Sequence, residues 1–317
     1  MRTSRFYTKI YNILLDLNRD SYIQRGIVFV VGEIRKYKIS KTKDYQKMPL
    51  VKTFIEGRKI IVPLSHNLAF YKKKYKNYDK HIIAVCNYVK EQKGYYNFID
   101  VGANVGDTII NIGIVDKAKY LLIEGGEYYI SLMKRNLKNY KYDYKLVDCF
   151  LSDEYSDDGY EIRYRSGTAS LVKDQNQHNK KTFTLDEVVS KEKFEPNILK
   201  IDTDGFDFKV LRGSKNTLKE YKPVIFFEWW SEYLVKNEEE PISIFKLLYE
   251  MGYKEGLLFD NYGTPILVIE TKDTMNLELL EQYSRNREKQ ICHYDVLLFH
   301  ESDILCVNDF LRKMYKY

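Results

Sequence analysis

The chain has few cysteines and histidines, and their spacing excludes several kinds of site. Of its 317 residues, four are cysteines, none of which forms a Cys-x-x-Cys pair: Cys86, Cys149, Cys292 and Cys306. This pattern argues against a zinc site or a redox motif and fits a reducing cytoplasm. The five histidines show no metal-ligand spacing either. We therefore expect no metal site and a cytoplasmic location.

Long apolar runs are also missing. The apolar stretch 27–31 stops at Gly32 and Glu33, far short of the roughly 20 residues that a membrane span requires. Near the N-terminus, charged residues such as Asp16 and Arg19 interrupt the apolar pattern, so we expect no cleaved signal peptide. The sequence thus predicts no transmembrane segment and at most a weak peripheral contact with a membrane.

Strong charge of one sign is absent as well. Lys and Arg number 51 against 45 Asp and Glu, and the 44% hydrophobic content is that of a globular protein. A net charge of +6, well mixed with acids, predicts a solvated surface, with weak attraction to anionic polymers, activated sugars or membrane headgroups as the alternative. The run 71–76 alternates Tyr and Lys, but both are common throughout, so we predict no nucleic-acid partner.

Hydrophobic periodicity divides the chain into two parts. Residues 1–78 are predicted to be a mostly helical extension, with an amphipathic helix around 6–17 followed by short β-like runs and polar turns over 20–75. We expect the apolar stripe of that helix to pack on the rest of the protein and the extension to cap the acceptor side. A helix over 79–92 then leads into a main domain, 79–317.

The main domain alternates short apolar strands with helical segments, which predicts a parallel sheet in a doubly wound, Rossmann-like α/β fold. The expected core strands are 98–101, 120–124, 144–148, 198–202 and 224–228, with a hairpin over 159–172 and later strands over 257–259, 265–269 and 294–299. Ligands bind such sheets at the carboxyl ends of the strands, so polar residues there are the site candidates.

The first such strand runs through a small-residue turn into a helix. Gly102 and Gly106 allow a ligand to approach the backbone, next to the free amide groups of a helix N-terminus. A dinucleotide site requires Gly-x-Gly-x-x-Gly, whereas the order here is Asp-x-Gly-x-x-x-Gly, and an acid at the strand end suits an amino group and a sulfonium better than a pyrophosphate. The predicted cofactor-binding residues are Asp100, Gly102, Ala103, Asn104, Gly106 and Asp107. A tight turn without a ligand is the alternative.

The next two strands end in further candidates. Glu124 can accept both hydroxyls of an adenosine ribose, although a nicotinamide enzyme would use the same contact. Asp148 and Ser152, after the third strand, are placed near the adenine by position alone.

The fourth strand carries Lys200 and Asp202 on one face, and Asp202 emerges at the carboxyl edge. The acidic cluster 202–207 resembles part of a calcium loop, but its twelfth position is Gly213 instead of the glutamate that an EF-hand requires. Asp204 and Asp207 are predicted to be a helix N-cap and its third-position partner. Asp202 has no such structural explanation.

Three stretches together resemble a known family. Residues 98–108, 198–213 and 222–228 are similar, in sequence and order, to the FkbM-type methyltransferases, and the similarity covers about residues 80–300. The resemblance implies a class I methyltransferase sheet, S-adenosylmethionine as methyl donor and O-methylation, often of sugars in surface polysaccharides or of natural products. The chain departs from the family at two places. It has Glu124-Gly125-Gly126 where the family commonly has an aromatic residue, Glu and Pro, and it has Asp204 where Glu is common.

A protonated hydroxyl is a poor nucleophile, so its methylation benefits from a base. We expect Asp202, and then Glu228, to act as base or to orient the acceptor, with Lys200 paired with or tuning one of them. The leading hypothesis is an S-adenosylmethionine-dependent O-methyltransferase acting on a small-molecule or glycan hydroxyl. A nicotinamide-dependent oxidoreductase and a noncatalytic nucleotide- or glycan-binding protein remain alternatives.

Overall fold

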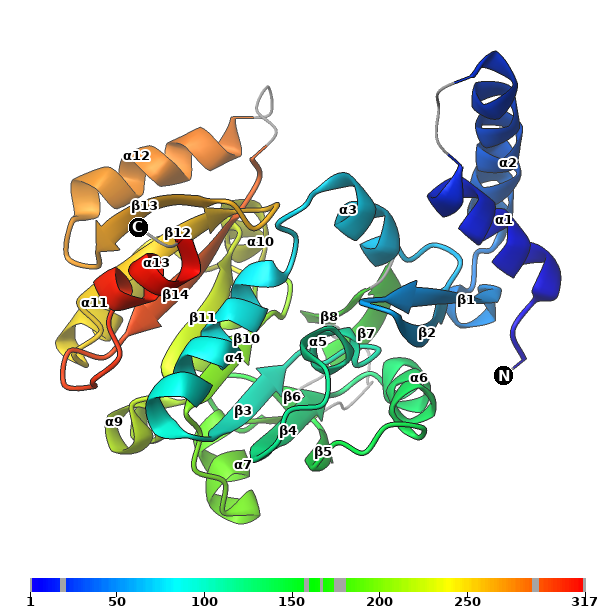
Figure 1. Cartoon of the computed structure of the whole chain (residues 1–317). Coiled ribbons are helices and arrows are strands. Elements are labelled where there is room, and N and C mark those ends of the chain that lie inside the picture. The colour runs from blue at the N-terminus through cyan, green and yellow to red at the C-terminus, as the bar shows by residue number, and fades with distance from the viewer. Residues whose placement is uncertain are drawn as a thin grey trace.

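The computed structural model describes residues 2–17, 21–156, 160–165, 168–173, 181–286 and 291–315, with no side-chain description for 157–180 and 315. Its centre is an eight-stranded sheet in the order β13-β12-β14-β11-β10-β3-β4-β5 (Figure 1). The parallel strands are β3 (Tyr96–Val101), β4 (Ala118–Glu124), β5 (Tyr144–Asp148), β10 (Ile198–Ile201) and β11 (Val224–Trp229). β14 (Tyr294–Phe299) lies antiparallel between β11 and β12 (Glu255–Asp260), and β13 (Pro265–Glu270) forms the edge.

The path of the chain makes the sheet doubly wound, as predicted. It enters at β3, moves outward to β5, returns to place β10 beside β3, and then moves outward in the other direction. The point where the strand order reverses lies between β3 and β10, which is where open α/β sheets bind ligands. The fold is therefore the Rossmann-like class I methyltransferase fold that the sequence indicated.

Helices cover both faces of this sheet because strand residues alternate between two hydrophobic cores. Phe98 and Tyr120 face one core, whereas their neighbours Ile99 and Leu121 face the other. The first core is covered by α4 (Lys80–Lys93), α5 (Asp107–Ile112), α6 (Glu127–Leu137) and α13 (Val307–Tyr315). The second is covered by α7 (Leu185–Glu192), α8 (Asp207–Arg212), α9 (Lys215–Tyr221), α10 (Ser231–Lys236), α11 (Ser243–Glu250) and α12 (Thr274–Arg285).

The N-terminal residues form α1 (Arg5–Asp16), α2 (Tyr22–Lys41), a 3-10 turn η1 (Tyr45–Lys47), an antiparallel pair of β1 (Leu50–Ile55) and β2 (Arg58–Pro63), and α3 (Leu68–Lys74). Tyr11 and Ile60 belong to the same core as Phe98. The Asn136 side chain of α6 accepts from the Ile61 amide and donates to the carbonyls of Ile61 and Val105, which joins β2 to the loop after β3. The division of the chain at residue 78 stays a prediction.

Residues 22–41 form a single helix, so the prediction of short β-like runs in this region was wrong. The Ser21 side chain accepts from the Gln24 amide at 3.2 Å, and the Gln24 side chain accepts from the Ser21 amide at 3.3 Å. This capping box starts the helix, and packing against α1 overrides the β preference of the run 27–31. The predicted hairpin is present as β7 (Tyr160–Arg165) and β8 (Thr168–Lys173). Within the described residues, no helix has the length and apolar character to cross a membrane.

Gly102 lies where β3, β4 and β10 meet. Its amide donates to the Ile123 carbonyl at 3.0 Å, and the Asp202 amide donates to the Val101 carbonyl at 3.1 Å. Its φ is +79°, and a Cβ at this position would collide with the carbonyl oxygen of Asp202. Glycine is therefore required both by the left-handed backbone and by the closeness of β10.

We expect Gly102→Ala to lower the free energy of unfolding by about 3 kcal/mol, because it adds a backbone clash to the cost of a left-handed alanine. Gly94→Ala is the matched control, because Gly94 has a φ of +78° and nothing within 4 Å of its Cβ position. It should cost about 1 kcal/mol. Urea denaturation of both variants measures the difference, and equal costs would contradict the close-packing argument.

Candidate functional site

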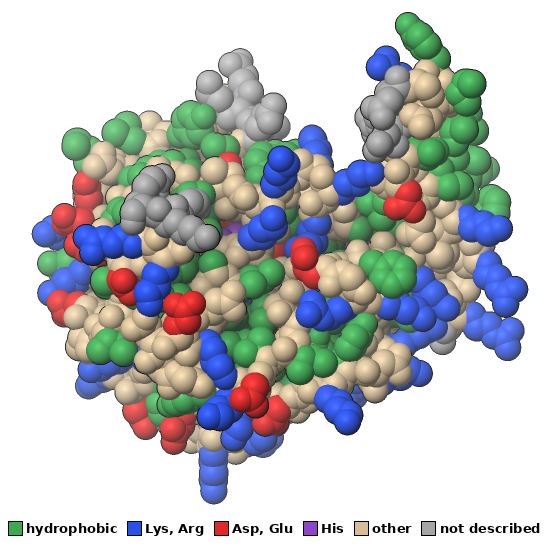
Figure 2. All heavy atoms as spheres, viewed as in Figure 1, with side chains coloured by type: hydrophobic (Ala, Val, Ile, Leu, Met, Phe, Trp, Pro, Cys, Tyr) green, Lys and Arg blue, Asp and Glu red, His purple; other side chains and the backbone are tan. Residues whose placement is uncertain are grey.

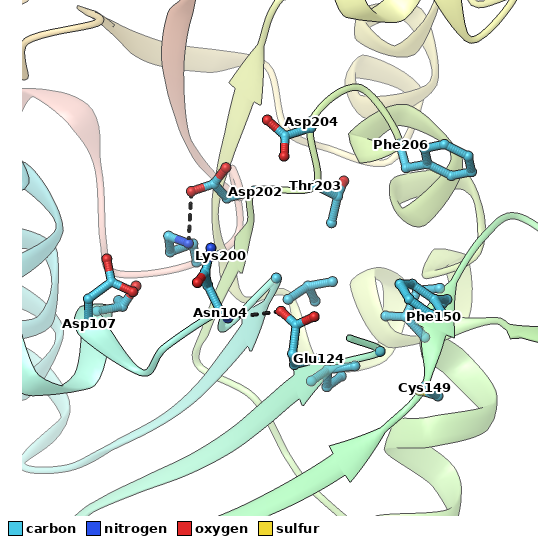
Figure 3. Close-up of a pocket in the computed structure, with 16 residues that line it drawn as sticks. Asn104, Asp107, Glu124, Cys149, Phe150, Lys200, Asp202, Thr203, Asp204 and Phe206 are labelled. Carbon is cyan, nitrogen blue, oxygen red and sulfur yellow. Dashed lines mark hydrogen bonds and ion pairs between the residues drawn. The ribbon is translucent and has the colours of Figure 1, made fainter. Parts of the chain in front are cut away.

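A pocket opens at the carboxyl edge of the sheet, around the loop between β3 and α5. The lining residues are Val101, Gly102, Asn104, Asp107, Thr108, Ile123, Glu124, Gly125, Cys149, Phe150, Leu151, Lys200, Asp202, Thr203, Asp204 and Phe206 (Figure 3). They come from the ends of β3, β4, β5 and β10, which parallel pairing brings to one edge. The site predicted from the sequence is thus assembled from four strand ends.

Glu124, at the end of β4, lines this pocket and is hydrogen-bonded to the backbone around it. Its two carboxylate oxygens accept from the backbone amides of Asn104, at 2.9 Å, and Gly126, at 2.8 Å. Burial raises the pKa of Glu124 to about 7, and these two hydrogen bonds oppose the rise. Each oxygen retains acceptor capacity, so the carboxylate can take two further hydroxyl donors from a ligand.

A buried lysine links the two central strands. The Lys200 ammonium lies 3.3 Å from the carboxylate of Asp202 (Figure 3) and 3.1 Å from that of Asp100. Asp100 is buried, whereas the side chain of Asp202 is 51% exposed at the pocket. Burial raises the pKa of Asp100, which Lys200 opposes, and the two carboxylates raise the pKa of Lys200. Lys200 is therefore a cation whose charge is already balanced.

The opposite wall is apolar and was missed by the sequence interpretation. Cys149, Phe150 and Leu151 line it. Asp148, by contrast, is exposed at the end of β5, and the Ser152 hydroxyl is buried and donates to Asp153. The two predicted residues therefore lie outside the lining, and the residues between them face the pocket. This segment is held by the short parallel pair β6 (Phe150–Leu151) and β9 (Thr182–Phe183), which the sequence did not indicate.

The unusual Gly125 has a structural reason. A Cβ on Gly125 would overlap the ring of Phe150, so the missing side chain lets that ring lie against the backbone beside Glu124. The departure from the family pattern thus goes together with an aromatic wall of the pocket.

Asp204 does not cap a helix, which corrects that prediction. It has a φ of +51°, and the N-cap of α8 is Phe206, without a side-chain cap. Asp207 instead accepts from the Thr203 hydroxyl at 2.9 Å and the Gly205 amide at 3.2 Å, which folds the loop back on itself. This turn brings Asp204 to the pocket lining.

Glu228, the second predicted base, lies at the end of β11 and is not among the pocket-lining residues. Its carboxylate is 3.4 Å from the imidazole of His293, which packs on Trp230 with ring centroids 5.0 Å apart. Burial and the nearby Asp202 raise the pKa of Glu228 well above its usual range, and burial lowers the pKa of His293. This pair could not be predicted from residue spacing, because 65 positions separate its members.

Of the residues predicted for the site, some line the pocket and others lie behind it. Gly102, Asn104, Asp107, Glu124, Lys200 and Asp202 line the pocket. Asp100 lies in β3 behind the pocket, and Ala103 and Gly106 lie in the turn that follows, where the Ala103 amide donates to the Ile123 carbonyl and Gly106 precedes α5. Within the described residues, no group of three or more His, Cys, Asp or Glu side chains could hold a metal ion.

We expect Lys200→Met to lower the free energy of unfolding by about 3 to 5 kcal/mol, because it leaves Asp100 buried without its counter-charge. Lys145→Met is the control, since the Lys145–Glu192 pair joins side chains that are 56% and 25% exposed. Its loss should cost less than about 1 kcal/mol. Chemical denaturation compares the two, and a small effect at Lys200 would show that the buried ion chain is not needed for stability.

Comparison with known proteins agrees with this geometry. Residues 100–255 match the family model described as the methyltransferase FkbM domain. No curated protein matches the chain. Among solved structures, the methyltransferase FkbM from Methylobacillus flagellatus KT is 10% identical, covering 92% of this chain and 58% of its own, with a TM-score of 0.35. The METTL16 MTase domain is 10% identical, covering 94% of this chain and 92% of its own, with a TM-score of 0.44.

This chain therefore spans little more than half of the Methylobacillus protein's length. The family match covers the end of β3, the strands β4, β5, β10 and β11, and the glycine loop, together with Glu124, Lys200 and Asp202. Residues 100–255 of this chain therefore form an FkbM-type methyltransferase domain.

Proposed function

We propose that this methyltransferase uses S-adenosylmethionine to methylate a hydroxyl group of a sugar, in a surface polysaccharide or a glycan precursor. The observation that carries the donor assignment is the charge of the pocket. Its lining holds the carboxyl groups of Asp107, Glu124, Asp202 and Asp204, and its one lysine, Lys200, is paired with two aspartates. Such a lining suits a donor with an ammonium and a sulfonium and disfavours the pyrophosphate of a nicotinamide cofactor.

The residues present fit the parts of that donor. Glu124 would accept the two ribose hydroxyls through its remaining acceptor sites, and Phe150 and Leu151 offer an apolar wall for the adenine. Asp107, the first residue of α5, would hold the cationic end. Gly102 leaves the space beside Asp202 clear, since a side chain there would strike the backbone of β10.

The donor supplies a methyl group already activated on sulfur, so the protein must align the acceptor and remove its proton. Asp202 is the first candidate for that base, because its carboxylate is exposed at the pocket and its pair with Lys200 fixes its position. Alignment can supply about 7 to 11 kcal/mol of the barrier. Glu228, beside His293 and Trp230, would orient the acceptor at the next strand end.

The acceptor class rests on the resemblance to the family, in which sugars are frequent acceptors. The free thiols of Cys86, Cys149, Cys292 and Cys306 support a reducing, cytoplasmic location. We propose that the partner of this chain is a small-molecule or glycan acceptor. We propose no nucleic-acid partner.

Donor binding is tested by calorimetric titration with S-adenosylmethionine, S-adenosylhomocysteine and NAD. We expect selective binding of the two sulfur compounds and at least about tenfold weaker binding by Glu124→Gln, which removes a charged hydrogen-bond acceptor. Because the pKa of Glu124 is raised to about 7, wild-type affinity should fall as the pH drops through 7, and less so in the variant.

Asp148→Asn is the matched control, because it is also a strand-end acid but is exposed outside the pocket. Its affinity should equal that of the wild type. Preferential binding of NAD would favour the oxidoreductase alternative, and equal losses in the two variants would contradict the assignment of Glu124.

Methyl transfer is tested with S-adenosylmethionine labelled in its methyl group and cell extracts separated into polysaccharide, nucleotide-sugar, protein and RNA fractions. We expect label in a sugar fraction, in an ether that resists mild alkali. Asp202→Asn should slow the transfer by about 10² to 10⁴-fold while donor binding is kept, because it removes the base. Asp143→Asn, an exposed acid elsewhere, should have no effect.

The position of the label decides between the alternatives. Label in RNA or protein would contradict the sugar acceptor. Donor binding without transfer to any fraction would favour a noncatalytic binding protein.

A further inference from the structure

The outward side of α2 is apolar and exposed. Tyr22, Ile23, Phe29 and Tyr37 expose 91%, 77%, 69% and 65% of their surface. Ile27, Val30 and Ile34 are exposed as well, and spacings of three, four and seven residues place all these side chains on one side of the helix. Single exposed apolar residues are ordinary in proteins, but a continuous stripe marks an interaction surface.

The opposite side of α2 already has its packing partner. Val28 is buried, and the Gly32 position lies 4.0 Å from the Leu14 side chain of α1. The helix is thus apolar on two sides, of which α1 covers one. In Figure 1 the pair α1 and α2 projects from the body, and Figure 2 shows hydrophobic side chains along the outer edge of this projection. The stripe is therefore accessible to a flat partner.

Basic residues border the stripe. Residues 21–41 contain a single acid, Glu33, and five basic residues: Arg25, Arg35, Lys36, Lys38 and Lys41. Glu33 is 2.8 Å from Lys36, so its charge is matched within the helix. The surface therefore combines apolar side chains with an excess of positive charge.

A groove beside the stripe has the same chemistry. Its volume is about 480 Å³, and its lining includes the apolar side chains of Leu14, Val28, Phe29 and Phe70. Three basic residues and one acid also line it, Arg25, Arg35, Lys36 and Glu33, so its net charge is positive. Arg35 is fixed by a 2.9 Å hydrogen bond to the Leu64 carbonyl and by stacking over Phe70. An apolar groove with fixed positive charge suits an acyl chain and its anionic headgroup.

We propose that the outward side of α2 docks on an anionic phospholipid bilayer, with Tyr22, Ile23, Phe29 and Val30 inserted at the interface and the basic residues against lipid phosphates. The helix would lie in the plane of the surface, as charged amphipathic helices with aromatic residues do. A second copy of the chain is the less favourable occupant, because two such faces would bring their basic borders together. This surface is separate from the methyl-transfer pocket and does not depend on the proposed donor or acceptor.

The test is flotation of the full chain with vesicles of phosphatidylcholine alone or with roughly one third phosphatidylglycerol. We expect binding to the anionic vesicles, little binding to the neutral ones, and loss of binding as NaCl is raised to about 0.5 M. Ile23→Gln/Val30→Gln should weaken the partition into anionic vesicles by about tenfold or more, because two apolar side chains no longer leave water. Glutamine keeps a good helix propensity at both positions.

Val235→Gln/Ile304→Gln is the matched control, since these side chains are 49% and 68% exposed on the body of the protein. It should bind vesicles like the wild type, and circular dichroism and calorimetric binding of S-adenosylhomocysteine should show that both double variants are folded. Equal binding by wild type and the α2 variant, or no binding to anionic vesicles, would overturn the proposal. A dimer in light scattering that only the α2 variant dissociates, without vesicle binding, would identify the second copy as the occupant instead.

Discussion

The site depends on one buried cation. Lys200 of β10 lies between Asp100 of β3 and Asp202 just beyond its own strand, at the point where the strand order reverses. Without it, two carboxylates would meet at the switch point, one of them buried, and the carboxyl ends of the central strands would repel each other. The ion chain lets β10 approach β3 closely enough that position 102 admits only glycine. The cation thereby sets the geometry of the loop, and its neutralised charge leaves the pocket acidic.

The far wall of the pocket is fixed by a second arrangement, built from the end of α8. Gly213 has no room for a side chain because the carbonyl of Ser152 lies against it, and Arg212 pairs with Asp153 at 2.9 Å and with Glu239 at 2.6 Å. These contacts hold the segment that follows β5, and this segment carries Phe150 and Leu151 into the pocket. Residues 210–213, Val-Leu-Arg-Gly, belong to the family-like stretch 198–213 but do not line the pocket. Their contacts support the pocket wall from behind, which gives this part of the stretch a structural role.

Features encoded locally could be predicted, and those that need distant partners could not. The strands and the glycine loop follow from hydrophobic periodicity and from the two glycines, and Lys200 and Asp202 share a face because of the period of a strand. The family resemblance added the methyltransferase-type fold and the expectation of methyl transfer. In contrast, α2 was missed because its β-branched run outweighed the Ser21 and Gln24 signal. The roles of Asp204, Phe150 and His293 depend on how loops from separate strands meet, and no spacing in the sequence encodes that.

The buried acids at this edge of the sheet also influence the charge of the ligand that the pocket favours. Burial raises the pKa of Asp107 and Glu124 to about 7 and that of Asp207 to about 6, above the values of an unfolded chain. The folded protein then binds these protons more tightly than the unfolded one, so these groups favour the folded state at low pH and this contribution is lost as the pH rises through 6 to 7. At neutral pH these buried acids therefore carry an electrostatic cost. A cationic ligand at this edge would relieve that cost and an anionic one would increase it, which favours the positively charged methyl donor proposed above.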